Sequence, residues 1–562
     1  MHKKSKYIFW TFSLLLIAAL WLFQNKISVN IPWWDDFHGI ILPVFHLFSN
    51  LPFLEKLKLF FSLNNEHRVV NDRLFLLAIY LLSGNFELKA LALLGFINLI
   101  LIFLVLVRVS KSLFGNRLYL LPLPLLIFHA QYYESLQSLM VPFQNFSVIL
   151  YAFLTYYFLI YRKNKGLILA FTFSILAIFS HGNGIMAFLI GVIILFFNKR
   201  NKDLKVWSLL SFTIIILYFW GYKKPEWSSG VSAFSQPLTA LRYVFEFFGA
   251  YALNITDLST RAKAVYSHHV SELFGLFLVV IFLVLFFKKY PLFSKRRLEA
   301  LEKLRHSKAD QFIVCVFGFV FATGLMIGIS RTGFSMLSRY TINSSFMAIA
   351  VYIFLVSNIK RKKAIGIMTT VFCSIILIIS YFNNYEIALF NRKNAVADGI
   401  NFQKMGTWSN QYIDSSHISK LNPLLLEPYK TKKYIFPASI LDTFSTVNSS
   451  ITNEKLSYSL NDGILEISGV INDNINPNTN ENGIYFSLEN KNKQFIFPAI
   501  NQKNNILKSI LQRKYFSDFY RTIYPVKLIP QEKYRLFKIE VIDNKVYKYD
   551  LGKTYGPNSM IR

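Results

Sequence analysis

Two adjacent carboxylates are the first residues in this sequence whose types could do chemistry. Asp35 and Asp36 follow a long apolar segment, in the string Trp33-Trp34-Asp35-Asp36-Phe37. Beside an apolar boundary, desolvation and mutual repulsion disfavour two ionised carboxylates, and such a pair can hold a general base. The alternative is structural, because either acid could cap a helix that begins at Phe37.

Two further polar groups could contribute to a binding site. Glu66, His67 and Arg68 place an acid, a titratable imidazole and an anion-binding guanidinium in succession. His181 and Asn183 alternate with glycines, which permit close approach of the backbone. Both groups are candidates for substrate binding. A solvated approach to the next helix is the alternative for the first group, and an ordinary turn is the alternative for the second.

A later polar loop is bracketed by two arginines. Arg331 and Arg339 are separated by seven uncharged residues, and Tyr340 follows directly. Two guanidiniums suit a phosphate or diphosphate, because each can donate two parallel hydrogen bonds to its oxygens. The loop is therefore a candidate anion-binding site. Pairing of these arginines with the acids of the earlier loop is the alternative.

The elements that must position these residues are apolar helices. The chain is 53% hydrophobic with a mean hydropathy of +0.37, more than one soluble core needs. A membrane crossing takes roughly 20 apolar residues, and segments of suitable length and hydropathy occur at 7–23, 90–107, 118–134, 142–161, 206–221, 271–287, 311–329, 341–358 and 364–381. A hairpin of two short helices is expected at 167–197, which brings the total to about eleven crossings. Residues 70–83 are too few to cross, so they predict a juxtamembrane helix.

The charge distribution predicts the orientation. Lys and Arg number 61 against 31 acids, a net charge of +30. The Lys and Arg residues lie in the connections between apolar segments and do not cluster on one soluble face, so nucleic acid is excluded as a partner. Connections at 108–117, 162–165, 198–205, 288–308 and 360–363 hold 22 of the basic residues. The positive-inside rule then predicts a cytoplasmic N-terminus and places the candidate residues on the opposite face.

The composition changes after residue 382. Residues 383–443 predict a partly helical connector. From 444 to 562, short runs alternate apolar and polar residues and are separated by turn signals, which predicts an extracytoplasmic β-rich, sandwich-like domain. The predicted fold is thus a mainly α polytopic membrane protein over 1–382, whose loop 24–89 carries juxtamembrane helices, followed by this domain. The only two cysteines lie in apolar runs, so neither a disulfide framework nor a Cys-based zinc site is expected.

These features together resemble the GT-C superfamily of polytopic membrane glycosyltransferases. The resemblance lies in an Asp-Asp pair directly after the first span, a long first loop, about eleven crossings and a C-terminal domain on the outer face. The strings Trp34-Asp35-Asp36-Phe37, Glu66-His67-Arg68 and Ser338-Arg339-Tyr340 further resemble uncharacterised bacterial members associated with envelope polysaccharides. The resemblance covers roughly residues 7–382, and it rests on the order of these short motifs and on the topology.

The resemblance implies an enzyme of the bacterial cytoplasmic (inner) membrane. It would transfer a sugar from a polyprenyl-phosphate donor to a glycan, lipid or protein acceptor on the outer face, usually with inversion. Asp35 would be the general base, and Asp36 would orient it or help to bind substrate or a metal. Arg339 would hold the donor phosphate. A divalent cation, Mg²⁺ or Mn²⁺, stays open, because no third acid follows at a recognisable spacing.

Two other functions use similar substrates. A transporter or flippase of lipid-linked sugars would place polar groups near the bilayer midplane, often in two related halves. In this sequence the polar groups follow the ends of the apolar segments, and no halves repeat. A polysaccharide polymerase or ligase would also use arginines on the outer face, but it would depend on a large late loop and would not need Asp35 and Asp36.

Overall fold

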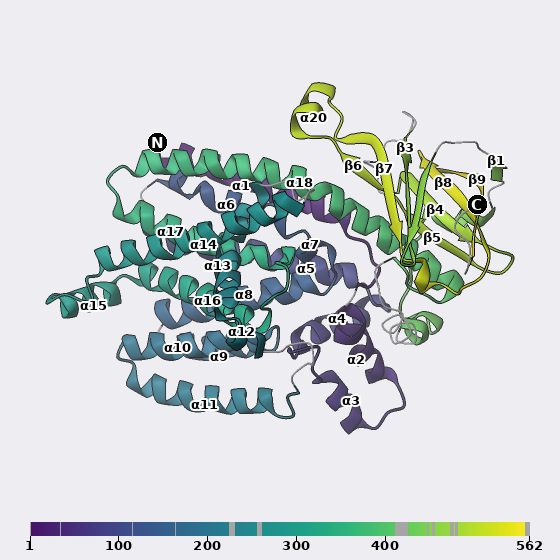
Figure 1. Ribbon diagram of the computed structural model, residues 1–562. Coiled ribbons are helices and arrows are strands. Elements are labelled where there is room, and N and C mark those ends of the chain that lie inside the picture. Colours follow the sequence, from purple (N-terminus) through teal and green to yellow (C-terminus); the bar gives the residue numbers. More distant parts are fainter. Residues whose placement is uncertain are drawn as a thin grey trace.

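A helical bundle and a β-sheet region make up the structure, a computed structural model (Figure 1). It describes residues 2–33, 35–114, 116–162, 164–223, 231–255, 261–410, 425–446, 449–451, 456–471, 477 and 481–556. The N-terminus and α15 (Arg297–His306) lie at one end of the bundle, here called the α15 end. The sheets and the short helices of the first loop lie at the opposite end, here called the sheet end.

Seven helices within the described residues are long and apolar enough to cross a membrane, by length and composition. They are α1 (His2–Ile27), α5 (Leu88–Ser110), α8 (Val141–Tyr161), α14 (Arg261–Lys289), α16 (Lys308–Ser330), α17 (Thr341–Asn358) and α18 (Lys362–Met405). This confirms the prediction of a mainly helical, membrane-compatible chain with a β-rich C-terminal region. The number of crossings stays a prediction.

One predicted crossing is not a continuous helix. Residues 118–134 form short pieces, namely η3 (Arg117–Leu120), α6 (Pro122–Ile127), η4 (Ala130–Tyr132) and the start of α7 (Glu134–Gln137). Pro122 begins α6, and the prolines at 122 and 124 have no N–H to extend a preceding turn. His129 then accepts a hydrogen bond from the backbone N–H of Gln131, which starts η4. The continuous helix expected here is interrupted, because hydropathy alone does not register these breaks.

Three other predicted segments form helices as the sequence predicted. The expected hairpin consists of α9 (Asn164–Ile178) and α10 (Ile185–Phe197), joined through η5 (Gly182–Gly184). The predicted crossing at 206–221 lies mostly in α11 (Asn201–Phe219), and the juxtamembrane helix is α4 (Val70–Ser83). In Figure 1, α4 lies at the sheet end of the bundle with α2 (Leu42–Phe45) and α3 (Phe53–Phe60).

A helix that the sequence analysis did not single out, α13 (Pro237–Gly249), packs closely against α14. A Cβ on Gly249 would lie 1.9 Å from the carbonyl oxygen of Ser271, and one on Gly275 would lie 1.9 Å from that of Phe245. Only glycine fits at such distances, so the two backbones meet without side chains between them. The bundle therefore contains a helix pair built on small residues.

Two sheets form the C-terminal region. The first has the strand order β1-β9-β8-β4-β5, and the second has the order β2-β3-β7-β6. The strands are β1 (Ser449–Ile451), β2 (Ser457–Asn461), β3 (Ile464–Val470), β4 (Gly483–Glu489), β5 (Gln494–Pro498), β6 (Ile500–Lys503), β7 (Phe516–Tyr524), β8 (Tyr534–Ile542) and β9 (Lys545–Tyr555). Residues of both sheets, such as Phe486 and Tyr520, share one apolar core, which is the sandwich arrangement expected. The pairing is antiparallel except between β1 and β9.

A single helix joins the sheets to the bundle. The 44 residues of α18 run without a break through residue 382, where the sequence predicted a domain boundary. Beyond this point, the Asn401 amide pairs with the backbone of Ile496 in β5, at 2.9 and 2.8 Å. Phe37 of the first loop contacts Trp408 just after α18, with ring centres 5.3 Å apart. The first loop, α18 and the sheets therefore meet in one shared core.

Candidate functional site

Asp36 is buried and ties the first loop to α8. Only 1% of the residue is exposed, and its two oxygens accept hydrogen bonds from the backbone N–H groups of Trp33 (2.7 Å) and Met140 (3.0 Å). Burial raises the pKa of Asp36 to about 7, although these two bonds act to lower it. Met140 directly precedes α8, so Asp36 caps that distant helix. Its side chain does not cap η1 (Phe37–Ile41), the helix that follows it in sequence.

Asp35 is half-buried and is held by a tight turn. The turn joins Asn64 and His67 through two backbone hydrogen bonds of 2.7 and 2.9 Å, and Asn65 adopts the left-handed conformation with a φ of 52°. Asparagine tolerates this conformation better than most residues do. The Asn65 side-chain amide donates to Asp35 Oδ1 at 3.1 Å. The turn thus brings the Glu66 motif beside the first carboxylate, and Asn65 is a site residue that the sequence analysis missed.

Glu66 faces Arg331 from the following polar loop. The Arg331 Nη2 lies 3.8 Å from Glu66 Oε1, and both side chains are largely buried. Burial raises the pKa of Glu66, while the charges of Arg331 and Arg339 oppose this rise. The second oxygen, Glu66 Oε2, is buried and has no hydrogen-bond partner among the described residues. It can therefore accept a hydrogen bond from a ligand hydroxyl.

The rings of the two candidate histidines lie against each other, tilted by 36°. The ring centres of His67 and His181 are 3.8 Å apart, and the backbone N–H of Gly182 donates to His67 Nδ1 at 3.3 Å. A Cβ at residue 182 would lie 2.9 Å from this nitrogen, which explains the glycine. His181 Nδ1 lies 2.8 Å from the side-chain oxygen of Asn183, whose amide donates to Thr323 in α16. The pair therefore links the first loop to the α9–α10 hairpin and to α16.

The pKa of each histidine in the pair lies below its usual value. Burial lowers the pKa of His67 well below its usual value and lowers that of His181 to about 4. The positive charges of Arg331 and Arg339 contribute in the same direction at both rings. Both arginines are therefore close enough for their charge to act on the two rings. Neutral imidazoles can donate or accept hydrogen bonds without adding charge.

Arg68 is directed away from this cluster. Its guanidinium donates to the backbone carbonyls of Phe61, Tyr218 and Trp220, with a distance of 2.7 Å from Nε to the Tyr218 oxygen. These bonds fasten the first loop to the end of α11. Arg68 was predicted to bind an anion, but its guanidinium donates to backbone carbonyl groups and is not directed toward the other candidate residues.

Arg339 lies at the start of α17, in η7 (Ser338–Tyr340). Its guanidinium carbon is 5.7 Å from the centre of the Tyr340 ring, and its backbone N–H donates to Glu134 Oε2 at 3.2 Å. Asp35 and Glu134 are the acidic groups that act on its charge. The Asp35 carboxylate is therefore close enough to Arg339 for the two charges to interact. Glu134 also contacts Arg339, and no role was predicted for it from the sequence.

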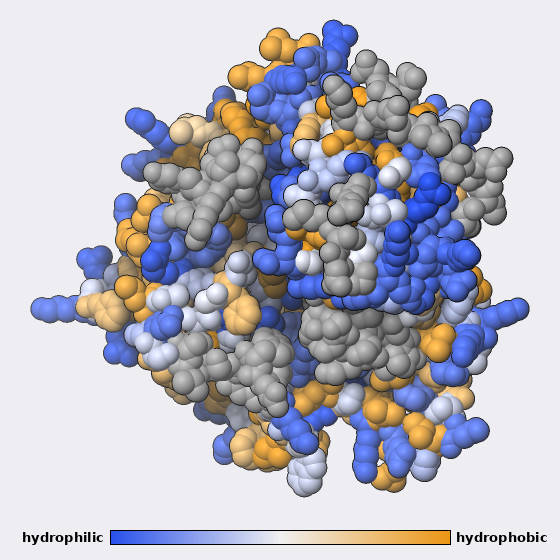
Figure 2. Space-filling model, turned by 45° about the vertical axis from the view of Figure 1, so that its right-hand side comes forward, coloured by the Kyte–Doolittle hydropathy of each residue, from blue (hydrophilic) through white to orange (hydrophobic). Residues whose placement is uncertain are grey.

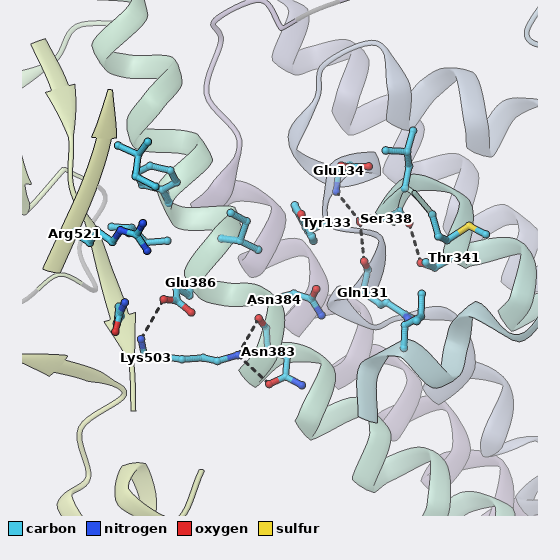
Figure 3. Close-up of a pocket in the computed structure, with 18 residues that line it drawn as sticks. Gln131, Tyr133, Glu134, Ser338, Thr341, Asn383, Asn384, Glu386, Lys503 and Arg521 are labelled. Atoms are coloured by element: carbon cyan, nitrogen blue, oxygen red, sulfur yellow. Dashed lines mark hydrogen bonds between the residues drawn. The ribbon is translucent and has the colours of Figure 1, made fainter. Parts of the chain in front are cut away.

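A cavity of about 660 Å³ lies between the bundle and the sheets (Figure 3). Gln131, Glu134, Ser338 and Thr341 line the bundle side. On the opposite side lie Asn383, Asn384 and Glu386 of α18 with Lys503 and Arg521 of the sheets. The Lys503 ammonium donates to Asn383 Oδ1 at 3.0 Å, which fixes this wall. The only sequence signal for the cavity was the amide pair that directly follows an apolar run.

A metal site is not evident. No group of three or more His, Cys, Asp and Glu side chains that could hold an ion occurs in the part of the chain that is described. The two oxygens of Asp36 already accept backbone hydrogen bonds. Asp36, the possible metal ligand in the sequence, is therefore engaged with the backbone.

Most of the predicted site residues converge. Segments far apart in the sequence bring together the Asp35, Glu66, His67, His181, Arg331 and Arg339 side chains, with Asn183 and Tyr340 supporting them. Comparisons with protein-family models, curated proteins and solved structures gave no match to this chain.

Proposed function

We propose that this protein is a membrane glycosyltransferase of GT-C-like architecture. It transfers a sugar from a polyprenyl-phosphate donor to an acceptor hydroxyl, at the membrane surface on the sheet end of the bundle. The observation that supports this most is the convergence of one accessible carboxylate, Asp35, with two arginines, Arg331 and Arg339. This reaction needs a base that accepts the hydroxyl proton and cationic groups that bind the donor phosphate.

In the proposed reaction, Asp35 accepts the proton of the acceptor hydroxyl as its oxygen attacks the anomeric carbon. The bond from that carbon to the phosphate oxygen breaks, and the electron pair stays on the phosphate. Arg331 and Arg339 would stabilise the negative charge that develops there. Glycosyl transfer of this kind balances without a redox partner.

The division of roles between the two aspartates follows from their surroundings. Asp36 is buried and holds two backbone N–H groups, so it cannot reach a substrate. Asp35 is half-buried, and among the described residues only the Asn65 side chain donates to its carboxylate. That bond orients the group and leaves Oδ2 to accept a proton. Asp35 is therefore the better base.

The cavity between the bundle and the sheets supports a saccharide acceptor. Its lining combines side-chain amides, carboxylates and hydroxyls, which can donate to and accept from sugar hydroxyls. Ser338 lines the cavity and directly precedes Arg339, so an acceptor there would end near the donor phosphate. Partners in this proposal are the lipid-linked sugar, an envelope glycan and membrane lipids.

The test compares the glycolipids and surface glycans of cells that lack the protein with those of complemented cells. Wild type and Asp35→Asn are expressed at matched levels, together with Glu55→Gln, an exposed acid in the same loop. We expect one glycan to depend on wild type and Glu55→Gln but to be lost with Asp35→Asn. A glycan profile that Asp35→Asn restores fully would refute the proposal. A change only in which leaflet holds the lipid-linked sugar would instead support a flippase.

A further inference from the structure

A short helix on the sheet domain exposes an apolar surface. It is α20 (Ile506–Gln512), which connects β6 and β7, and none of its residues is buried. The exposed fractions are 40% for Ile506, 70% for Leu507, 69% for Ile510 and 83% for Leu511. A seven-residue helix gains little stability by itself and usually needs packing against an apolar partner. Four aliphatic side chains on one such helix indicate an interaction surface.

The segment from β6 through α20 to β7, here called the finger, projects from the sheets. Figure 1 shows α20 extending past α18, on the side of the sheets that is nearer the bundle. It is the topmost element in that view, and Figure 2 shows hydrophobic side chains at the same height. The finger thus reaches beyond the outline of the bundle, into the space that lipid would fill around α18.

The base of the finger is held where α18 passes the end of its apolar stretch. The Tyr515 hydroxyl donates to the carbonyl of Phe382 at 2.6 Å, and the Tyr515 ring centre lies 5.2 Å from that of Phe382 and 5.3 Å from that of Tyr385. The end of α1 lies at the same level, since Lys26 is 5.2 Å from the centre of the Tyr385 ring. Tyrosines and a lysine at one level are typical of a membrane–water interface.

The charges around the apolar surface are basic. Lys508 lies within α20, Arg513 directly follows the helix, and Lys514 comes next and pairs with Asp518. All three basic residues are exposed. Aliphatic side chains beside lysine and arginine match the boundary between acyl chains and phosphate headgroups.

We propose that the finger inserts α20 into the lipid bilayer surface and so anchors the sheet domain to the membrane. Ile506, Leu507, Ile510 and Leu511 enter the acyl boundary, while Lys508 and Arg513 contact lipid phosphates. The strands at its base carry Lys503 and Arg521, which line the cavity. Anchoring would therefore hold the sheet-side wall of the cavity against the bundle. This inference rests on the membrane-crossing helices and not on the proposed transfer reaction.

The test measures lipid contact directly in the full-length protein. Leu511→Cys, in a background with Cys315→Ala and Cys373→Ala, is labelled with an environment-sensitive fluorophore and placed in nanodiscs. The discs contain phosphatidylcholine with or without a nitroxide quencher near the top of the acyl chain. The control label is at Asn492, an exposed residue in the turn before β5. That strand contacts α18 at Asn401, about 28 Å farther along the helix than Phe382.

We expect the nitroxide to quench the label at residue 511 several-fold more than the label at residue 492. Adding Leu507→Asp should reduce the quenching at residue 511. The double variant Lys508→Glu, Arg513→Glu should also reduce it, and the reduction should be larger in discs that contain phosphatidylglycerol than in discs of phosphatidylcholine alone. Thermal stability in detergent should stay unchanged in these variants, because no residue of α20 is buried and Arg513 is exposed. Equal quenching at the two positions would overturn the proposal. A blue-shifted but unquenched label at 511 would also overturn it, because a second copy or another protein would then cover α20.

Discussion

The backbone N–H of Met140 donates to Asp36 Oδ1 at 3.0 Å, across a separation of 104 residues. This bond makes Asp36 the link between the first loop and α8. The adjacent Asp35 bonds only to Asn65 through its carboxylate, among the described residues. The two neighbouring acids thus have different environments. Substitution of Asp36 should affect the stability of the protein, and substitution of Asp35 should affect catalysis.

Asp36→Asn should destabilise the protein. An amide offers one acceptor oxygen where the carboxylate offers two, so one buried N–H of Trp33 or Met140 loses its partner. An unsatisfied buried donor costs about 1–3 kcal/mol. Thermal unfolding in detergent should show a lower Tm than in wild type or in Asp35→Asn. An unchanged Tm would show that Asp36 does not hold the loop.

Asp35→Asn should keep the fold but lose transfer by about 10²-fold or more, the scale expected for removal of a catalytic base. The amide can still bond to Asn65 but cannot accept the acceptor proton. Transfer from a radiolabelled polyprenyl-phosphate sugar is measured in nanodiscs, and donor binding is measured separately. Binding should remain near the wild-type value. Full transfer activity in this variant would eliminate the assigned role.

Arg339→Lys should weaken donor binding although it keeps the charge. A single ammonium cannot reproduce the two parallel hydrogen bonds of a guanidinium to a phosphate. Arg331→Lys should have a milder effect, because Arg331 also faces Glu66 and its assigned role is supporting electrostatics. Affinity for a polyprenyl-phosphate sugar and the transfer rate are the two readouts. If Arg339→Ala lowers only the Tm and changes neither readout, Arg339 is a structural residue.

The paired histidines His67 and His181 predict a loss of stability in acid. Burial lowers the pKa of both rings in the folded protein, to about 4 for His181, whereas an unfolded histidine titrates near 6.5. Between these values the unfolded chain binds protons that the folded chain does not, so stability falls as pH falls below about 6.5. The raised pKa of Asp36 acts in the opposite direction.

A variant isolates the histidine contribution to this acid response. His181→Gln should show a smaller drop in Tm between neutral and acid pH than wild type. The exposed His306→Gln should show the wild-type drop. Equal drops in all three proteins would mean that the folded pKa of His181 is not lowered.

Topology is tested by single-cysteine labelling in intact cells, again in a background without the two native cysteines. Ser49, in the first loop, lies at the sheet end of the bundle, and Lys295 lies just before α15, at the opposite end. A membrane-impermeant reagent should label Ser49→Cys from outside and should reach Lys295→Cys only after permeabilisation. Labelling of Lys295→Cys from outside would refute the predicted orientation.

The sequence by itself determined the local elements. Apolar run length predicted most of the long helices, and the short run at 70–83 predicted α4. The hairpin around His181 also formed as expected. These features depend on residues within a few helical turns of one another, so hydropathy and spacing carry the information. Even there, the prolines at 122 and 124 interrupted an apolar run that hydropathy counted as one span.

Only the tertiary structure decided which polar residues serve the backbone and which serve the site. Arg68 and Asp36 were both predicted to be site residues. Arg68 instead donates to backbone carbonyls that lie 7 to 152 residues away in the sequence. Asp36 accepts from backbone N–H groups that lie 3 and 104 residues away. The cavity likewise joins Ser338 to Lys503 through the continuation of α18 beyond residue 382. A buried polar group must find a partner wherever the chain brings one. No local pattern specifies that partner, because it is set by the packing of distant elements.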